Sequence, residues 1–134
     1  MICVYNDEMQ MVATLTLLIR NKGNFRYASH DNLAVASKYK GQGIASFVFD
    51  EALRISKEQN LAFLSSSTAT NAGSSVAYHK KKGVLIYQKS FGKGYNSYSY
   101  ILPLQRFKAL RCGLVRLPIY LVLTLKNKIR YLIK

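Results

Sequence analysis

The sequence predicts a mixed α/β (α+β) domain, in which helices flank a central mixed, mostly antiparallel sheet and a basic helical tail follows. Three observations lead to this prediction. Runs rich in Val, Ile, Thr and aromatic residues alternate with two helical patterns as far as residue 102. A basic loop with two glycines, at 38–43, joins one of these runs to an amphipathic helix. From residue 105 onward the chain is basic and leucine-rich, with a proline at 118.

Six strands are expected, and turn residues separate most of them. They are predicted at 2–5, 9–19, 25–35, 61–65, 84–91 and 95–102. The last two strands are joined by a glycine-containing turn and are expected to pair as a hairpin. The serine- and threonine-rich run 65–70 is expected to be a loop.

Two helices are expected before the tail. The first starts at residue 44 and ends near residue 60, and its apolar positions at helical spacing are Ile44, Phe47, Val48, Ala52 and Ile55. The second runs from Ser74, its expected N-cap, to Lys82, and Gly83 suits the position just after it.

Length and composition indicate one folded domain at residues 1–104 and a tail at 105–134. The chain has 134 residues, 49% of them hydrophobic, which is enough for a sizeable core. Its net charge of +14 calls for an anionic partner, surface or substrate. Cys3 and Cys112 are too few and too far apart for a disulfide framework or a metal site, so no metal is expected. With no signal peptide visible, a cytoplasmic location is expected.

The loop at 38–43 has the features of a phosphate-binding site. Gly41 and Gly43 can adopt a positive φ and leave space for a ligand, while Lys38 and Lys40 add positive charge at the start of a helix. Two nucleotide-binding motifs are excluded. A P-loop needs Lys-Ser/Thr after its last glycine, where this chain has Ile44 and Ala45, and a Rossmann loop needs a third glycine, where Ser46 stands.

This stretch resembles the signature of the GNAT superfamily of N-acetyltransferases. The family has a strand ending in Leu-x-Val, four further residues, and then Arg/Lys-Gly-x-Gly-Ile-Gly/Ala at the start of a long helix. In that family the loop amides hold the pyrophosphate of acetyl-CoA, and the strand backbone pairs with the pantetheine arm. The resemblance therefore implies acetyl-CoA as co-substrate. The residues implied to bind it are Leu33, Val35, Lys38, Lys40, Gly41, Gln42, Gly43, Ile44 and Ala45.

A second block, at 71–83, resembles the family's Asn-x-x-Ser/Ala pattern, which continues to a Tyr or His and ends in x-Lys-x-Gly. Counting back from Gly83 places His79 at the Tyr/His position and Ser75 at the Ser/Ala position, while Asn71 lies one residue too far upstream. The resemblance implies that Asn71, Ser75 and Tyr78 also contact the cofactor.

Three residues are candidates for proton transfer. His79 could protonate the departing CoA thiolate, and its alternative is a solvent-facing helix residue. Tyr78 is the adjacent alternative donor, but it is expected to face the core. Asp31 could deprotonate the amine, directly or through water, and its alternative is a polar residue at a strand edge. His30 is expected on the opposite sheet face unless a bulge intervenes.

The resemblance implies an N-acetyltransferase that transfers acetyl from acetyl-CoA to a primary amine of a small molecule, with an amino sugar as one option. The amine would attack directly, and a strand amide near Val35 would polarise the thioester carbonyl. The competing interpretation is a non-catalytic acyl-CoA-binding or interaction module. The family's first strand and helices, which shape the acceptor pocket, have no counterpart in this sequence. That favours the competing interpretation or a truncated gene.

The tail carries only basic charged residues, which are Arg106, Lys108, Arg111, Arg116, Lys126, Lys128, Arg130 and Lys134. Its apolar run from Gly113 to Leu125 is shorter than the about 20 residues that a membrane span needs. Two short amphipathic helices, broken at Pro118 and lying on the inner membrane surface, would fit this pattern. A helix packed on the domain, or on a second subunit as a homodimer, fits equally well. Nucleic-acid stacking on Tyr95, Tyr98, Tyr100 and Phe107 ranks last.

Overall fold

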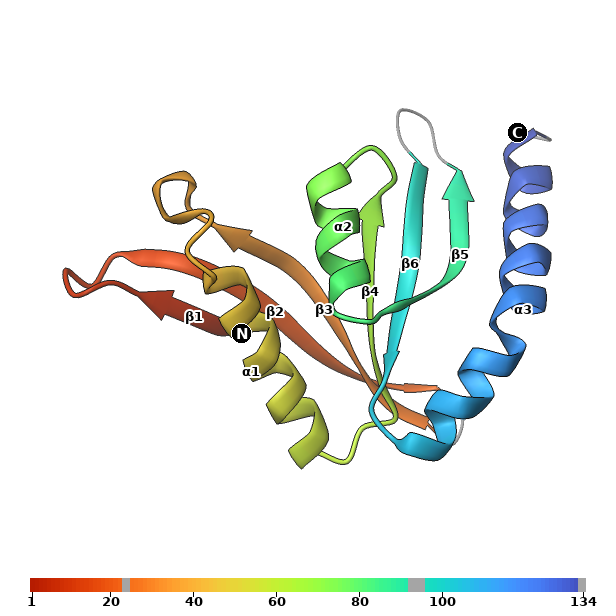
Figure 1. The fold of residues 1–134 in the computed structure, drawn as a ribbon, viewed down its shortest axis with the longest axis horizontal. Coiled ribbons are helices and arrows are strands. Elements are labelled where there is room, and N and C mark those ends of the chain that lie inside the picture. Colours follow the sequence, from red (N-terminus) through yellow and green to blue (C-terminus); the bar gives the residue numbers. More distant parts are fainter. Residues whose placement is uncertain (23–24, 92–95, 133–134) are drawn as a thin grey trace. The chain divides into compact units, whose positions relative to one another are not determined.

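The computed structural model describes residues 1–22, 25–91 and 96–132, with the backbone alone at 22, 25 and 106–117. The strands are β1 (Ile2–Tyr5), β2 (Met11–Lys22), β3 (Phe25–Val35), β4 (Phe63–Ala69), β5 (Leu85–Phe91) and β6 (Asn96–Pro103). The helices are the short 3-10 helix η1 (Ser37–Tyr39), α1 (Ile44–Glu58), α2 (Gly73–Lys81) and α3 (Arg106–Leu132). Figure 1 shows these elements along the chain.

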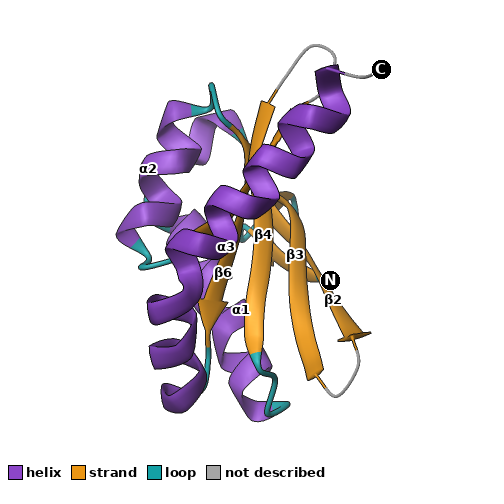
Figure 2. Ribbon diagram, turned by 90° about the vertical axis from the view of Figure 1, so that its right-hand side faces the viewer, coloured by secondary structure: helices purple, strands orange, loops and turns teal. Residues whose placement is uncertain are grey.

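The six strands form a sheet in the order β1-β2-β3-β4-β6-β5. The pairs β1/β2, β2/β3 and β5/β6 are antiparallel, so the predicted mixed α/β class with a mostly antiparallel sheet is confirmed. Figure 2 distinguishes the strands from the helices. By its internal contacts the chain forms two compact units, Met1–Leu64 and Ser65–Lys134. The helix predicted as a separate tail belongs to the second unit.

In the first unit, α1 packs on the sheet through one apolar face. Val48 and Ala52 of α1 form a buried cluster with Ala13 and Leu15 of β2. The expected stripe was partly wrong, because Phe47 is 63% exposed whereas Phe49 is fully buried. At about 100° per residue the buried face centres on Ala52, and Phe47 lies well away from it.

Strand β3 contains a bulge that reverses its in-and-out pattern. Opposite β2, Thr16 pairs with Asp31 and Thr14 with Ala34, so β3 has one extra residue in this interval. Asn32 within it has φ 54°, in the left-handed region. An extra residue shifts the alternation of side chains by one. The inward positions are consequently even-numbered before the bulge, as at His30, and odd-numbered after it, as at Leu33.

The second unit corrects two local predictions. The run expected as a loop at 65–70 continues strand β4 to Ala69, and the Thr70 N–H donates to the Asn96 carbonyl at 2.8 Å. Ser74 is not the N-cap of α2, because the helix starts one residue earlier with Ala72 in that position and no side-chain cap. The predicted helix end is confirmed, since Gly83 follows it with φ 76° and its N–H donates to the Lys80 carbonyl.

The C-terminal segment is one helix rather than two. Helix α3 runs through Pro118, and its axis bends part-way along (Figure 1). A proline removes one helical hydrogen bond and kinks a helix, but it need not end the helix when the segment packs on a neighbour. Its neighbour is β5, which agrees with the alternative of a helix packed on the domain. Among the helices that the structure describes, none combines the length and apolarity needed to cross a membrane.

The two phenylalanines of α1 offer a matched test of its packing. Replacing Phe49 with Ala should lower the free energy of unfolding by about 3–5 kcal/mol, because it leaves a cavity in the core. Replacing Phe47 with Ala should change it by no more than about 0.5 kcal/mol, because that ring is already in water. Urea denaturation followed by circular dichroism would measure both variants. Equal effects would contradict the assigned face.

Candidate functional site

The turn from β3 into α1 is built around two left-handed glycines. After β3, the Ala36 N–H donates to the Val12 carbonyl at 2.9 Å, and η1 then leads into the loop. Gly41 and Gly43 both have φ 82°, a conformation that costs other residues free energy. Among the described residues, no heavy atom lies within 4 Å of where a Cβ would be at either glycine. The backbone of the loop is therefore open to a ligand.

The N-terminus of α1 is suited to an anion. Gly43 is its N-cap and offers no side-chain oxygen, and the first helical bond runs from the Phe47 N–H to the Gly43 carbonyl at 3.0 Å. The amides of residues 44–46 precede that bond, and the helix dipole favours negative charge there. The first turn itself carries no acidic side chain.

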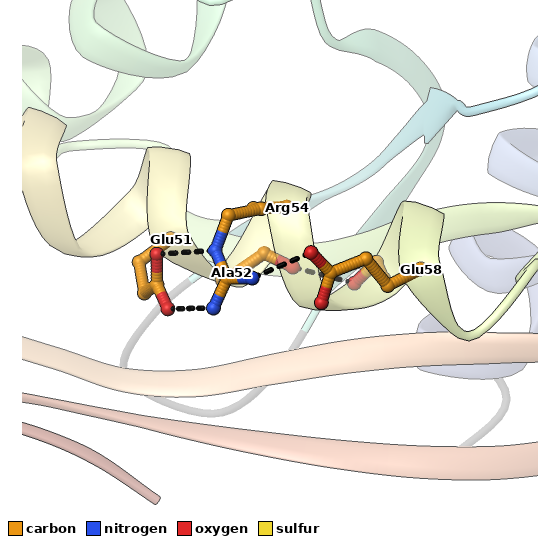
Figure 3. A network of polar contacts seen from close by, with 5 residues as sticks. Glu51, Ala52, Arg54 and Glu58 are labelled. Atoms are coloured by element: carbon orange, nitrogen blue, oxygen red, sulfur yellow. Dashed lines mark hydrogen bonds and ion pairs between the residues drawn. The ribbon is translucent and has the colours of Figure 1, made fainter.

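The acidic residues of α1 lie farther along the helix, and two of them are paired. Arg54 binds Glu51 through Nε at 2.9 Å and through a second nitrogen at 2.5 Å, and it reaches Glu58 at 2.5 Å (Figure 3). The guanidinium of Arg54 lowers the pKa of Glu51. Pairs on an exposed face add little to stability. Arg54 therefore partly neutralises the charges of Glu51 and Glu58 on the helix surface.

The two loop lysines have different surroundings. The ammonium of Lys38 lies 3.5 Å from Oε1 of Gln10 and 4.9 Å from the centre of the Tyr39 ring. The Tyr39 hydroxyl accepts a 2.9 Å hydrogen bond from Asn6, which with Lys38 lowers the pKa of Tyr39. These contacts tie η1 to the turn between β1 and β2. Lys40 is exposed beside Gly41.

The remaining candidate residues of the first unit lie on strand β3, and they differ in how far they are buried. Leu33 and Val35 pack against the core under α1, which leaves their backbone as the part that a cofactor could pair with. Asp31 is exposed, while His30 is buried and meets the Phe49 ring edge-on at 5.3 Å. The bulge residue Asn32 was missed. The signal was the pair Asp31-Asn32 in a strand, because Asn and Asp accept left-handed backbone more readily than most residues.

In the second unit His79 is buried, which excludes the solvent-facing alternative. It is 4% exposed, and its ring stacks on Tyr100 at 4.8 Å, almost parallel. Its Nδ1 lies 2.7 Å from the Ser75 carbonyl, which can only accept, so Nδ1 carries the proton. Burial lowers the pKa of His79, although the Ser75 carbonyl partly opposes this effect. A neutral ring in this tautomer has a lone pair on Nε2.

The other residues of 71–83 divide between the surface and the interior. Tyr78 is half-buried and meets the His79 ring edge-on at 5.6 Å. Tyr78 was expected to face the core, but the buried residue is His79. The Ser75 hydroxyl lies 2.8 Å from Oγ1 of Thr68 and 3.4 Å from Nδ1 of His79, and it thus helps to position the ring. Asn71 is exposed in the turn before α2.

Tyr100 bears on the nucleic-acid alternative. Its ring is fully buried and its hydroxyl has no hydrogen-bond partner among the described residues. Burial raises the pKa of Tyr100, and Tyr98 nearby adds to the rise. A buried ring is not available to stack on a base, so Tyr100 does not support the nucleic-acid alternative, which ranked last. Tyr95 and the Phe107 side chain lie outside the described residues.

A family comparison agrees with the loop geometry. The model of the acetyltransferase (GNAT) family matches residues 1–84 of this chain. The chain belongs to the GNAT family. The match includes the β3–α1 turn and also the whole of α2, so both blocks noted in the sequence lie inside it.

Solved structures share this GNAT fold. The NatC complex bound to Gag peptide and CoA aligns with a TM-score of 0.67 at 17% identity, covering 71% of this chain and 62% of that chain. A GNAT-family acetyltransferase from Staphylococcus aureus Mu50 gives 0.66 at 20% identity, covering 77% and 66%. The yncA protein of Salmonella typhimurium, with its cofactor acetyl-CoA, gives 0.64 at 10% identity, covering 75% and 62%. At these identities the likeness shows the fold, and the chain spans less than two thirds of each of the three chains.

A search of curated protein sequences found no match to this chain.

Burial of His79 predicts a pH dependence of stability. Because its folded pKa is lowered, its neutral form contributes fully above the unfolded pKa of about 6.5. That contribution is lost as the pH falls from 6.5 towards the folded pKa, since the unfolded chain then binds more protons. As the pH is lowered from 8 to 5, the melting temperature of His79→Gln should therefore fall less steeply than that of the native chain. The control Ser75→Ala keeps the ring buried and should keep the native slope; identical slopes for all three would contradict the assignment.

Proposed function

We propose that this GNAT chain is an acetyltransferase that moves the acetyl group of acetyl-CoA to a primary amine by direct attack. The observation that carries the proposal is the pair of left-handed glycines at the N-terminus of α1, next to Lys40 and with no acidic residue in the first turn. Such a turn suits the diphosphate of CoA, since it offers backbone amides, positive charge and no side chain in the way. The CoA and acetyl-CoA present in the NatC and yncA structures support the same ligand.

The binding roles follow from the surroundings of each residue. The amides of 41–45, including those of Gln42, Ile44 and Ala45, would donate to the diphosphate. Lys40 would form an ion pair with the diphosphate. Lys38 would contribute less to binding, because its ammonium already contacts Gln10 and Tyr39. The backbone at Leu33 and Val35 would pair with the pantetheine arm. Asn71 and Tyr78 are proposed to contact the cofactor from the second block.

Acetyl transfer requires three proton transfers besides forming the N–C bond and breaking the C–S bond. The amine must lose a proton before attack, and exposed Asp31, directly or through water, would take it. The nitrogen lone pair then forms the N–C bond while a β3 amide near Val35 polarises the carbonyl, and the C–S bond breaks. The nitrogen, positively charged after the attack, gives its second proton to water. The bulge at Asn32 supports this role, because a bulge frees backbone groups from the strand ladder. The leaving sulfur finally takes a proton.

We assign that last proton to Tyr78 in preference to His79. The Tyr78 hydroxyl is an O–H donor in its neutral form. The neutral His79 ring carries its only proton on Nδ1, where it is bonded to the Ser75 carbonyl, and burial opposes the charged form that could donate from Nε2. His79 would then act by packing under Tyr78. The acceptor is proposed to be a small primary amine, with an amino sugar as the first candidate.

Cofactor binding can be tested with two nearly isosteric variants of the loop. Gly43→Asp and Gly43→Asn accept left-handed backbone about equally, but only the first adds a negative charge at the diphosphate. Calorimetry should show the Asp variant binding CoA at least about 10-fold more weakly than the Asn variant. Circular dichroism would confirm that both remain folded. Equal CoA affinities would contradict a diphosphate at this turn.

Measurements of turnover distinguish the two candidate proton donors, Tyr78 and His79, and also test whether the chain is an enzyme. Tyr78→Phe should lower kcat on the order of 100-fold with little change in CoA affinity, whereas His79→Phe should change kcat by less than about 10-fold. The reverse order would return the donor role to His79. The acceptor panel should contain amino sugars, other small amines and a peptide N-terminus, because the NatC structure holds a peptide. CoA binding without turnover on any amine would favour the non-catalytic acyl-CoA-binding module.

A further inference from the structure

One face of helix α3 packs on strand β5 of the second unit. The Lys89 N–H of β5 donates to the Thr124 hydroxyl at 3.1 Å, and the Asn127 amide donates to the Lys89 carbonyl at 3.0 Å. The rings of Phe91 and Tyr131 lie 6.3 Å apart in the same interface. Figure 1 shows α3 running beside β5. This face, with Thr124, Asn127 and Tyr131 spaced three or four residues apart, fixes the rotation of the helix about its axis.

The opposite face of α3 carries a second apolar row that points to solvent. Its members recur at intervals of three and four residues, the spacing of one helix face. We call this row the outer stripe, and it consists of Leu121, Val122, Leu125, Ile129 and Leu132. Val122 is 64% exposed and Leu132 is 70% exposed, so the packing on β5 does not cover them. Single exposed leucines are ordinary, but a continuous row on one helix marks an interaction surface.

The charges beside the outer stripe are all positive. Lys126 and Lys128 project about 80° to either side of it, and Arg130 lies farther round the helix. Every acidic residue of the chain precedes residue 59, so the whole second unit has no carboxylate side chain to neutralise them. An apolar row bordered on both sides by cations is the pattern of a helix that lies in the headgroup region of a membrane.

We propose that the outer stripe of α3 rests on an anionic lipid surface, with the helix axis parallel to the membrane. In this arrangement the apolar side chains enter the boundary between headgroups and acyl chains. The flanking ammonium and guanidinium groups remain at the level of the lipid phosphates. Attachment of the other face to β5 holds the helix in this orientation while the domain stays in water.

Charge complementarity favours lipid over a second copy of the chain. Two copies packed stripe to stripe would bring Lys126 and Lys128 near the same residues of the partner, and α3 has no acidic side chain to compensate. Anionic headgroups supply the missing negative charge. A nucleic acid would supply it too, but it would leave Val122, Leu125 and Ile129 unused.

Sedimentation with vesicles tests the proposal on the full chain. The probes are vesicles of phosphatidylcholine alone and vesicles with one third phosphatidylglycerol. The chain should bind the anionic vesicles at least about 10-fold more tightly, and high salt should weaken this binding. Lys126→Gln, Lys128→Gln and Arg130→Gln together should reduce it by about 10- to 100-fold, on the basis of about fivefold for each basic residue.

The apolar contribution needs its own variants and a matched control. Val122→Ser, Leu125→Ser and Ile129→Ser together should reduce binding by about 10-fold or more, and Leu125→Ser alone should give a smaller loss. The control Met9→Ser, Met11→Ser and Ile19→Ser replaces three exposed apolar side chains of the first unit and should bind like the native chain. Melting curves would confirm that each variant is folded.

Three results would overturn the proposal. The first is no preference of the native chain for anionic vesicles. The second is vesicle binding that the outer-stripe variants leave unchanged, which would mean that charge alone drives it, as for a nucleic-acid partner. The third is a dimer in analytical ultracentrifugation that the stripe variants dissociate while vesicle binding is absent, which would make the occupant a second copy.

Discussion

The sharp turn between β3 and α1 depends on left-handed backbone at two places in one loop. With Gly41 and Gly43 at φ 82°, the chain turns from the strand into the helix. A side chain at either position would strain the backbone and occupy the space above it. The core supports this turn, because Leu33 and Val35 on one side and Ile44 and Val48 on the other pack into the same cluster. The geometry of the loop is therefore held by apolar packing rather than by the loop itself.

In the second unit, too, some residues serve to position others. The His79 ring is held by a hydrogen bond to Ser75 and by stacking on Tyr100, and it in turn contacts Tyr78. Thr68 supports Ser75 through a hydrogen bond between their hydroxyls. Residues that look reactive in the sequence can thus be structural, while a less prominent neighbour remains accessible. In our proposal, burial and tautomer decide between them, and neither property can be read from residue identity.

Much of the fold could be predicted because it rests on local signals. The β-runs, the glycine loop, the helix at 44–58 and the glycine after α2 each leave a clear pattern. The errors arose where distant contacts override local preference. Ser65–Thr68 became strand because neighbouring strands pair with them, Phe49 rather than Phe47 is buried because the sheet selects the face, and Pro118 stays within a helix that β5 supports. The bulge at Asn32 depends on its partner strand and could not be placed from β3 alone.

The hydrogen bonds from α3 to Lys89 also have a consequence for self-assembly. β5 is the last strand in the sheet order, and an open last strand presents unpaired N–H and C=O groups to which another chain can add as a further strand. Thr124 and Asn127 occupy both backbone groups of Lys89 at this edge. A helix cannot continue the ladder of a sheet, so α3 terminates it. The C-terminal helix therefore blocks the addition of another chain at the β5 edge of the sheet, whatever its outer face binds.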